Sequence, residues 1–347
     1  MHQINTALLS FGMSGRVFHA PFLEAHPGFK LSGAWERSSK TIQDIYPQVK
    51  SYTSLEEILK EEEIELVIVN TPNHTHFEYA KKALLAGKHV IAEKAFTTTV
   101  KEATELKTLA DSLRRHLSVY HNRRWDSDFK TIQKIVNENV TGEIVEAAIH
   151  FDRYKPRLGI KQHKELPQPG AGLLNDLGPH IIDQAICLFG MPASLFADIR
   201  ITREGSRVDD WFDITLYYPG FPVRLKAGFF VPEKLPGFII RGKKGSFLKA
   251  RSDVQENHLQ QGKPVQDSDW GIEPVEASGR LFTEADGKIV QLIIPTLAGN
   301  YYGYYDAVYK SIQNNLPAPV TAQDGINVMK IIEAAIKSSN EKKVINL

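Results

Sequence analysis

The segment from Ile4 to Gly15, INTALLSFGMSG, decides how the first third of the chain folds. Its apolar run ends at Ser10, and glycines follow at positions 12 and 15, before a stretch of helical character begins at Arg16. A strand, a glycine-containing turn and a helix in immediate succession make up the first half of a βαβ unit. Glycine lets a backbone approach a bound group closely, and the free N–H groups of a helix start attract anions. The segment therefore predicts a phosphate site at the end of the first strand.

Short apolar runs and helical stretches alternate through the rest of residues 1–122. Strands that are separated by helices indicate right-handed βαβ units, so we predict a doubly wound parallel sheet of the Rossmann type. The predicted strands are Ile4–Ser10, Phe29–Glu36, Leu66–Asn70, His89–Glu93 and Leu117–Tyr120, and the predicted helices are Arg16–Ala25, Ser54–Lys60, His76–Ala86 and Val100–Leu113.

Residues 123–347 have a different pattern, in which strands follow one another with few helices between them. Such runs predict a second α/β domain with an open, mostly antiparallel sheet. Its C-terminal helices are expected to be able to pack back on the first domain, residues 1–122. The predicted strands are Glu143–Phe151, Leu195–Arg203, Phe212–Tyr218, Val223–Phe230, Phe238–Arg241 and Lys288–Ile294, and the helices are Asp126–Asn137, Gly178–Phe189, Tyr301–Gln313 and Asp324–Ser338.

Composition excludes several classes of protein. The 347 residues carry a formal net charge of +1 and a single cysteine. There is thus no basic excess for nucleic-acid or membrane-surface binding, and neither an intramolecular disulfide nor a multi-cysteine zinc site can form. The N-terminus lacks the basic region of a signal peptide, and no apolar run is long enough to span a bilayer. We expect a cytoplasmic protein without nucleic-acid or membrane partners.

SFGMSG stands where a dinucleotide-binding fold has G-x-G-x-x-G, with Ser10 in place of the first glycine. Gly12 would let the backbone approach a pyrophosphate, and Gly15 would let the helix pack on the strand. Glu36 follows Gly15 by 21 positions, the spacing of an acid that binds the ribose of NAD, whereas the adjacent Arg37 and Ser38 suit the 2′-phosphate of NADP. We favour NADP and leave NAD open. For SFGMSG itself, the alternative is an ordinary strand-to-helix turn that binds no nucleotide.

Two further motifs carry candidate catalytic groups. KHVIAEKAF (88–96) ends an apolar run at Lys94, and the carboxyl ends of parallel strands are where such folds bind ligands. In NDLGPHIIDQA (175–185), Asp176 precedes His180 by four residues, which is the spacing of neighbours on one helix face. Histidine is suited to take the proton of an alcohol during oxidation. Alternatives are an N-cap aspartate beside an ordinary histidine, or a metal site that adds His163; we expect no metal.

With SFGMSG, AEKAF, YHNRRWDSDF and NDLGPHIIDQA in this order, the chain resembles the Gfo/Idh/MocA oxidoreductases over essentially its whole length, most closely the NADP-dependent scyllo-inositol dehydrogenase branch. The resemblance implies reversible hydride transfer between a nicotinamide and a sugar, cyclitol or related alcohol. It implies that Lys94, Asp176 and His180 are catalytic and also contact substrate. Ala95 stands where the family has a proline, often after a cis peptide bond, so the conformation of this bond is left open.

The resemblance also implies binding residues, which we combine with those suggested by the motifs. The expected cofactor contacts are Gly12, Met13, Ser14, Gly15, Glu36, Arg37, Ser38, Thr71, Pro72, Asn73, His76, Glu93, Asn122 and Arg123. The expected substrate contacts, besides the catalytic residues, are Arg123, Trp125, Arg153, Tyr154 and His163. The last three lie in FDRYKPRLGIKQHKE, which could equally be a solvated loop.

The leading hypothesis is an NAD(P)-dependent dehydrogenase that acts on a CH–OH group of an inositol or sugar. The alternatives are an NAD-dependent glycoside hydrolase, which oxidises its substrate only transiently, and a non-catalytic nucleotide sensor. A broad apolar sheet face favours a homodimer or homotetramer. Substrate identity and reaction direction stay open.

Overall fold

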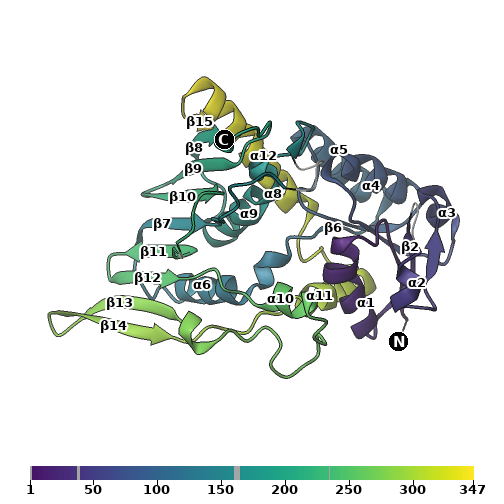
Figure 1. The fold of residues 1–347 in the computed structure, drawn as a ribbon, viewed down its shortest axis with the longest axis horizontal. Coiled ribbons are helices and arrows are strands. Elements are labelled where there is room, and N and C mark those ends of the chain that lie inside the picture. The colour runs from purple at the N-terminus through teal and green to yellow at the C-terminus, as the bar shows by residue number, and fades with distance from the viewer. Residues whose placement is uncertain (1, 37–39, 160–164, 234) are drawn as a thin grey trace. The chain divides into compact units, whose positions relative to one another are not determined.

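The computed structural model describes residues 2–36, 40–159, 165–233 and 235–347. The chain divides into two compact units (Figure 1). The first comprises residues 1–122, 255–270 and 300–326, and the second comprises residues 123–254, 271–299 and 327–347.

The first unit is built on a parallel sheet of six strands in the order β3-β2-β1-β4-β5-β6. This is the strand order of the Rossmann fold, and it confirms the predicted doubly wound sheet. The short strand β3 was not predicted, because three residues show no periodicity. The strands are β1 (Ile4–Leu8), β2 (Phe29–Trp35), β3 (Lys50–Tyr52), β4 (Leu66–Val69), β5 (His89–Ala92) and β6 (Leu117–Val119).

The helices predicted for the first unit lie at the predicted positions with one difference, whereas α2, η2 and α10 were not predicted. The stretch predicted as a single helix over 16–25 is a π-helix, η1 (Gly15–His19), that continues into α1 (Ala20–Ala25). The N-terminus of α5 has a capping box between Thr99 and Glu102, which satisfies two backbone N–H groups. The other helices are α2 (Ile42–Ile45), α3 (Leu55–Lys60), η2 (Asn73–Thr75), α4 (His76–Leu85), α5 (Val100–Leu113), α10 (Gln255–Gln260) and α11 (Tyr302–Gln313).

The second unit contains a sheet of nine strands in the order β14-β13-β12-β11-β7-β10-β9-β8-β15. Among the described strands of this sheet, only β7 and β10 pair in parallel, so the predicted, mostly antiparallel sheet is confirmed. Strands β12 and β13 were not predicted, since each carries glycine and charged residues that weaken the apolar alternation. Strand β15 was not predicted because its two residues are too few to show a period. The strands are β7 (Ile144–His150), β8 (Ser194–Arg200), β9 (Trp211–Tyr218), β10 (Phe221–Gly228), β11 (Phe238–Gly242), β12 (Gly245–Lys249), β13 (Gly279–Ala285), β14 (Lys288–Ile294) and β15 (Ile345–Asn346).

Helices cover one face of this sheet. Helix α9 packs on β7 and β10, and α6 packs on β12 (Figure 1). The buried side chains of these strands alternate with half-exposed ones, as expected where only one face lies against a core. Across the described ranges, no helix is long and apolar enough to cross a membrane. The helices are η3 (Asn122–Trp125), α6 (Ser127–Asn137), α8 (Leu173–Asp176), α9 (Gly178–Phe189), η4 (Val275–Ala277) and α12 (Ala322–Glu341), the last of which begins in the first unit.

Candidate active site

The glycine loop, Ser10–Gly15, connects β1 to η1. The Ser10 hydroxyl accepts a hydrogen bond of 3.2 Å from the Gly12 N–H, and the Ser10 carbonyl accepts one of 2.8 Å from the Asn70 amide. A Cβ added at Gly15 would lie 2.3 Å from the Ser10 oxygen, so only glycine fits this packing of helix on strand. Gly12 and Met13 are exposed. Open loop backbone before a helix N-terminus fits a dinucleotide pyrophosphate.

The two glycines predict different mutational effects. We expect Gly15→Ala to lower the melting temperature and to weaken cofactor binding at least about 10-fold, because the new Cβ forces helix and strand apart. Gly12→Ala is the matched control, since its Cβ would meet nothing in the chain closer than 3.4 Å. It should keep the wild-type melting temperature and weaken binding only by crowding the cofactor. Thermal unfolding and quenching of protein fluorescence by NADPH measure both effects. Equal melting temperatures for the two variants would contradict the packing argument.

Glu36 lies just after β2 and is only 8% exposed. Its carboxylate accepts hydrogen bonds from the N–H and hydroxyl of Thr41, at 2.9 and 2.8 Å, from the Ile42 N–H at 3.3 Å and from the Ser51 hydroxyl at 3.0 Å. The chain itself therefore uses both carboxylate oxygens. Arg37 and Ser38, the other predicted cofactor contacts here, lie outside the described residues.

Four predicted cofactor contacts lie between the end of β4 and the first residue of α4, His76. Pro72 is exposed, and Thr71 and Asn73 are half-buried, so these residues line the surface. His76 is fully buried, and its ring nitrogens lie 2.8 Å from the carbonyl oxygens of Ala95 and Thr71. Burial lowers the pKa of His76, so the neutral ring donates to only one of these oxygens at a time. His76 thus joins this segment to the residue that follows Lys94.

Lys94 is half-buried and follows the C-terminal end of β5. The peptide bond between Lys94 and Ala95 is cis. The preceding residue, Glu93, accepts hydrogen bonds from the Ser14 hydroxyl at 2.6 Å, from His19 Nε2 at 3.1 Å and from the Lys94 N–H at 3.2 Å. One carboxylate therefore connects the glycine loop to the backbone of the candidate catalytic lysine.

Asp176 and His180 lie in the second unit, on two helices rather than one. Asp176 is the last residue of α8, and α9 begins at Gly178, with Leu177 between them. The spacing of four residues therefore does not fall within one regular helix, as the sequence interpretation assumed. Asp176 is half-buried, and His180 is 6% exposed.

Phe151 is the centre of a cluster that the sequence predicted only in part. Its ring centroid lies 6.3 Å from that of His180, and the guanidinium groups of Arg123 and Arg153 lie 5.1 Å from it. Arg251, which was not predicted, is closer, at 4.4 Å, and its Nε donates to the His150 carbonyl oxygen. The cluster presents cationic, hydrogen-bonding side chains beside His180.

The remaining predicted residues differ in their exposure. Trp125 is half-buried, Asn122 is 5% exposed and Tyr154 is 60% exposed, while His163 lies outside the described residues. Sequence reasoning also missed Arg124, which binds Asp183 of α9 through two hydrogen bonds of 2.8 and 2.6 Å. A bidentate pair of this kind holds η3 against the helix that carries His180.

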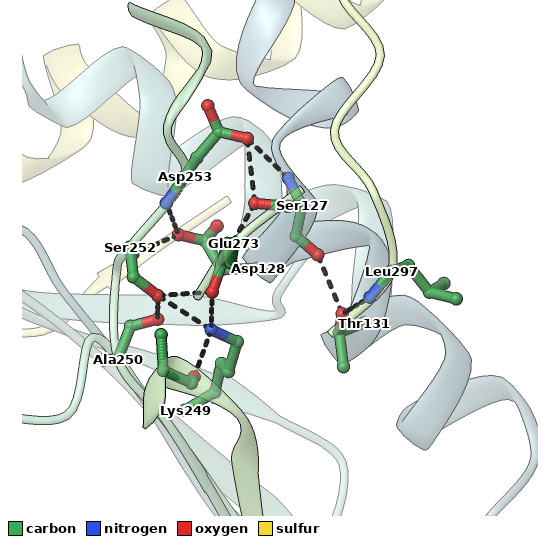
Figure 2. Close-up of polar contacts among 10 residues, drawn as sticks. Ser127, Asp128, Thr131, Lys249, Ala250, Ser252, Asp253, Glu273 and Leu297 are labelled. Atoms are coloured by element: carbon green, nitrogen blue, oxygen red, sulfur yellow. Dashed lines mark hydrogen bonds and ion pairs between the residues drawn. The ribbon is translucent and has the colours of Figure 1, made fainter. Parts of the chain in front are cut away.

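A buried polar network supports the two segments that carry Arg123 and Arg251 (Figure 2). Lys249 Nζ and Glu273 Oε2 lie 2.6 Å apart, and both side chains are fully buried. Glu273 also accepts a hydrogen bond from Ser127 at the start of α6. Asp128 Oδ2 accepts hydrogen bonds from the N–H groups of residues 252 and 253. The network therefore joins the loop around Arg251 to the helix that follows Arg123.

Among the described residues, no group of three or more His, Cys, Asp or Glu side chains could hold a metal ion. The metal site considered from Asp176, His180 and His163 involves a residue outside the described ranges.

Comparison with known proteins identifies the family. Residues 4–121 match the model of the oxidoreductase family with an NAD-binding Rossmann fold, and residues 133–347 match the C-terminal alpha/beta domain of the same Gfo/Idh/MocA family. The chain belongs to the Gfo/Idh/MocA oxidoreductases. The resemblance drawn from its motifs is thereby confirmed.

Individual relatives match along the full chain. The scyllo-inositol 2-dehydrogenase (NADP(+)) of Bacillus subtilis is 39% identical, covering 99% of this chain and 96% of the relative. An uncharacterized oxidoreductase of Schizosaccharomyces pombe is 40% identical over 100% of both chains. A Bacteroides fragilis protein with a crystal structure has 43% sequence identity to this chain. The two structures have a TM-score of 0.90, and the match covers 100% of both chains.

Proposed function

We propose that this oxidoreductase is an NADP-dependent dehydrogenase that transfers hydride between the nicotinamide and a secondary hydroxyl of an inositol or sugar. The observation that carries the proposal is the attachment of Lys94 to the glycine loop through Glu93. A cation held next to the loop that fits the cofactor can stabilise the negative charge that develops on the oxygen of an alcohol as it is oxidised. The full-length similarity to an NADP-dependent inositol dehydrogenase supports the same substrate class.

The environment of Glu36 favours NADP over NAD. An acid that binds the ribose hydroxyls of NAD needs free acceptor oxygens, but those of Glu36 already accept hydrogen bonds from Thr41, Ile42 and Ser51. Arg37 and Ser38 follow directly in the sequence, and a guanidinium group binds phosphate in a bidentate fashion. We therefore assign Glu36 to holding Thr41, Ile42 and Ser51, and Arg37 with Ser38 to the 2′-phosphate.

The proposed chemistry divides among three side chains. When bound, the cofactor would supply the nicotinamide ring that accepts the hydride. Lys94 donates a hydrogen bond to the reacting oxygen and stabilises the negative charge that develops on it. His180 takes the hydroxyl proton as general base, and Asp176 positions the substrate and His180. The substrate hydroxyls would meet polar side chains of the second unit, namely Arg123, Trp125, Arg153, Tyr154 and His163.

Cofactor preference and substrate class are tested together by following nicotinamide reduction with NADP and with NAD across a panel of inositols and aldoses. We expect an inositol to be oxidised with a kcat/KM at least about 10-fold higher for NADP, since a bidentate phosphate contact contributes roughly 1.5–3 kcal/mol. Arg37→Ala should raise the KM for NADP and leave that for NAD unchanged.

The other outcomes of this assay identify the alternatives. Release of a free sugar from a glycoside without net reduction would favour the hydrolase. Cofactor binding without either reaction would favour the sensor. A preference for NAD that Arg37→Ala does not alter would overturn the assignment of the 2′-phosphate site.

We also propose that residues 123–347 bind the substrate and form a homodimer or homotetramer. The edge strand β14 exposes Ile289, Leu292 and Ile293 at 74%, 47% and 55%. A cluster of exposed large apolar side chains is typical of a protein interface. Light scattering coupled to size-exclusion chromatography measures the oligomeric state, and a monomer would exclude this part of the proposal.

A further inference from the structure

A buried chain of polar side chains in the first unit runs from η1 to the residue before Lys94. His19 is fully buried, and its Nε2 lies 3.1 Å from Glu93 Oε1. Its Nδ1 lies 2.8 Å from the Tyr305 hydroxyl, which in turn donates to the Phe18 carbonyl oxygen at 2.7 Å. The imidazole is thus held from both sides, by α11 and by the end of β5.

The π-helical form of η1 explains how both Ser14 and His19 reach the same carboxylate oxygen. In an α-helix, residues five apart point about 140° away from each other, because each residue turns the chain by about 100°. In a π-helix the hydrogen bond spans five residues, so residues five apart lie on nearly the same side. Ser14 and His19 both bind Glu93 Oε1. Local π-helical turns are frequent at functional sites.

The groups in this series of hydrogen bonds determine which of its atoms carry protons. Burial alone would raise the pKa of Glu93, but its hydrogen bonds with His19 and Ser14, together with the charge of Lys94, lower it to about 2. Glu93 is therefore a carboxylate and can only accept, so His19 Nε2 carries a proton. Burial raises the pKa of Tyr305 well above its ordinary value, so its hydroxyl stays protonated.

We propose that His19 is a positioning residue for Lys94, which it orients by holding the Glu93 carboxylate between the glycine loop and the lysine backbone. The inference rests on the proposed function and deepens it, because it assigns a role to a side chain outside the expected catalytic and cofactor contacts. Since Glu93 also binds Ser14, the link makes the placement of the lysine depend on the loop that fits the cofactor.

Two substitutions of nearly equal size separate this role from simple packing. The amide nitrogen of glutamine lies about as far along the side chain as Nε2, and that of asparagine about as far as Nδ1. His19→Asn should therefore lose the Glu93 hydrogen bond and lower kcat about 10-fold, with KM values for NADP and polyol changed less than about threefold, because a misplaced catalytic group costs turnover rather than binding. His19→Gln keeps a donor toward Glu93 and should recover most of the loss.

A double-mutant cycle with Lys94→Ala then tests whether His19 acts through the lysine. We expect His19→Asn to have no further effect on the residual turnover of Lys94→Ala. Three results would overturn the proposal. His19→Asn could lower kcat by the same factor with and without Lys94, the Asn and Gln variants could lose equal turnover, or His19→Asn could keep the kcat of the wild type.

Stability is checked by thermal unfolding of each variant. If His19→Asn does not fold, Ser14→Ala takes its place, because Ser14 is half-buried and is the other donor to Glu93 Oε1. A double-mutant cycle of Ser14→Ala with Lys94→Ala then tests whether the Glu93 carboxylate acts through the lysine. A wild type that binds NADP but transfers no hydride would remove the proposed function itself. If the wild type transfers hydride but the effects of substitutions at residues 19 and 94 are independent, only the role of His19 is refuted.

Discussion

Replacing Lys94 with alanine is expected to lower kcat by about 10²–10³-fold, the usual effect of removing a donor to a developing oxyanion. Lys94 lies two residues after the end of β5, and Glu93 accepts a hydrogen bond from its backbone N–H. Its backbone is therefore held in place, and the loss should come from the missing ammonium group. Cofactor affinity should stay within a few-fold of wild type, because the glycine loop is unaltered. Initial rates with NADP and the preferred polyol measure the first effect, and titration with NADPH measures the second.

Lys107→Ala is the matched control. This lysine lies on α5 of the same unit, is substantially exposed and pairs with Asp111 one turn along the helix. Its removal should leave kcat unchanged and alter stability by no more than about 0.5 kcal/mol. Unchanged turnover in Lys94→Ala, with cofactor still bound, would refute the catalytic assignment of Lys94 and favour the sensor.

The second large effect is expected on stability. Lys249→Met should lower the free energy of unfolding by about 3–5 kcal/mol, because it leaves the buried carboxylate of Glu273 without its cation. Neighbouring hydroxyls cannot replace the charge, although Ser127 and Ser252 keep their hydrogen bonds to Glu273 (Figure 2). Urea unfolding followed by fluorescence and circular dichroism measures the change as a shift in midpoint.

Arg241→Met provides the comparison for this experiment. Arg241 also forms an ion pair within the second unit, with Glu146, but both side chains are about half exposed. Removing an exposed pair should cost no more than about 1 kcal/mol. The double variant Lys249→Met/Glu273→Leu should lose less than the sum of its single variants, since no buried charge is left unpaired. Equal midpoints for the Lys249→Met and Arg241→Met variants would contradict the predicted effect of burial.

Local pattern was enough to predict much of the architecture. The alternation of apolar runs and helices predicted the parallel sheet, because a buried strand and an amphipathic helix each leave a periodic trace within a few residues. The helices Val100–Leu113 and Gly178–Phe189 have the predicted bounds, and each begins at a recognisable signal, Thr99 as N-cap or Pro179 in the first turn. The position of Lys94 at a strand end follows from the same reasoning.

Elements that leave no periodic pattern in the sequence were not predicted, or were predicted in another form. Strand β3 has only three residues, and helix α8, which carries Asp176, has only four. The π-helical turn of η1 has no signature in composition, and it becomes intelligible only when the bonds of Ser14 and His19 to Glu93 are known.

The sequence by itself determined the fold class, the glycine loop and the ends of strands that carry candidate catalytic groups, because these depend on neighbours along the chain. Only the tertiary structure decided which side chains support them. His19 and Glu93 are separated by 74 residues, Arg124 and Asp183 by 59, and Lys249 and Glu273 by 24. Contacts over such separations depend on which strands and helices become neighbours in space, and periodicity within one element carries no information about its partners.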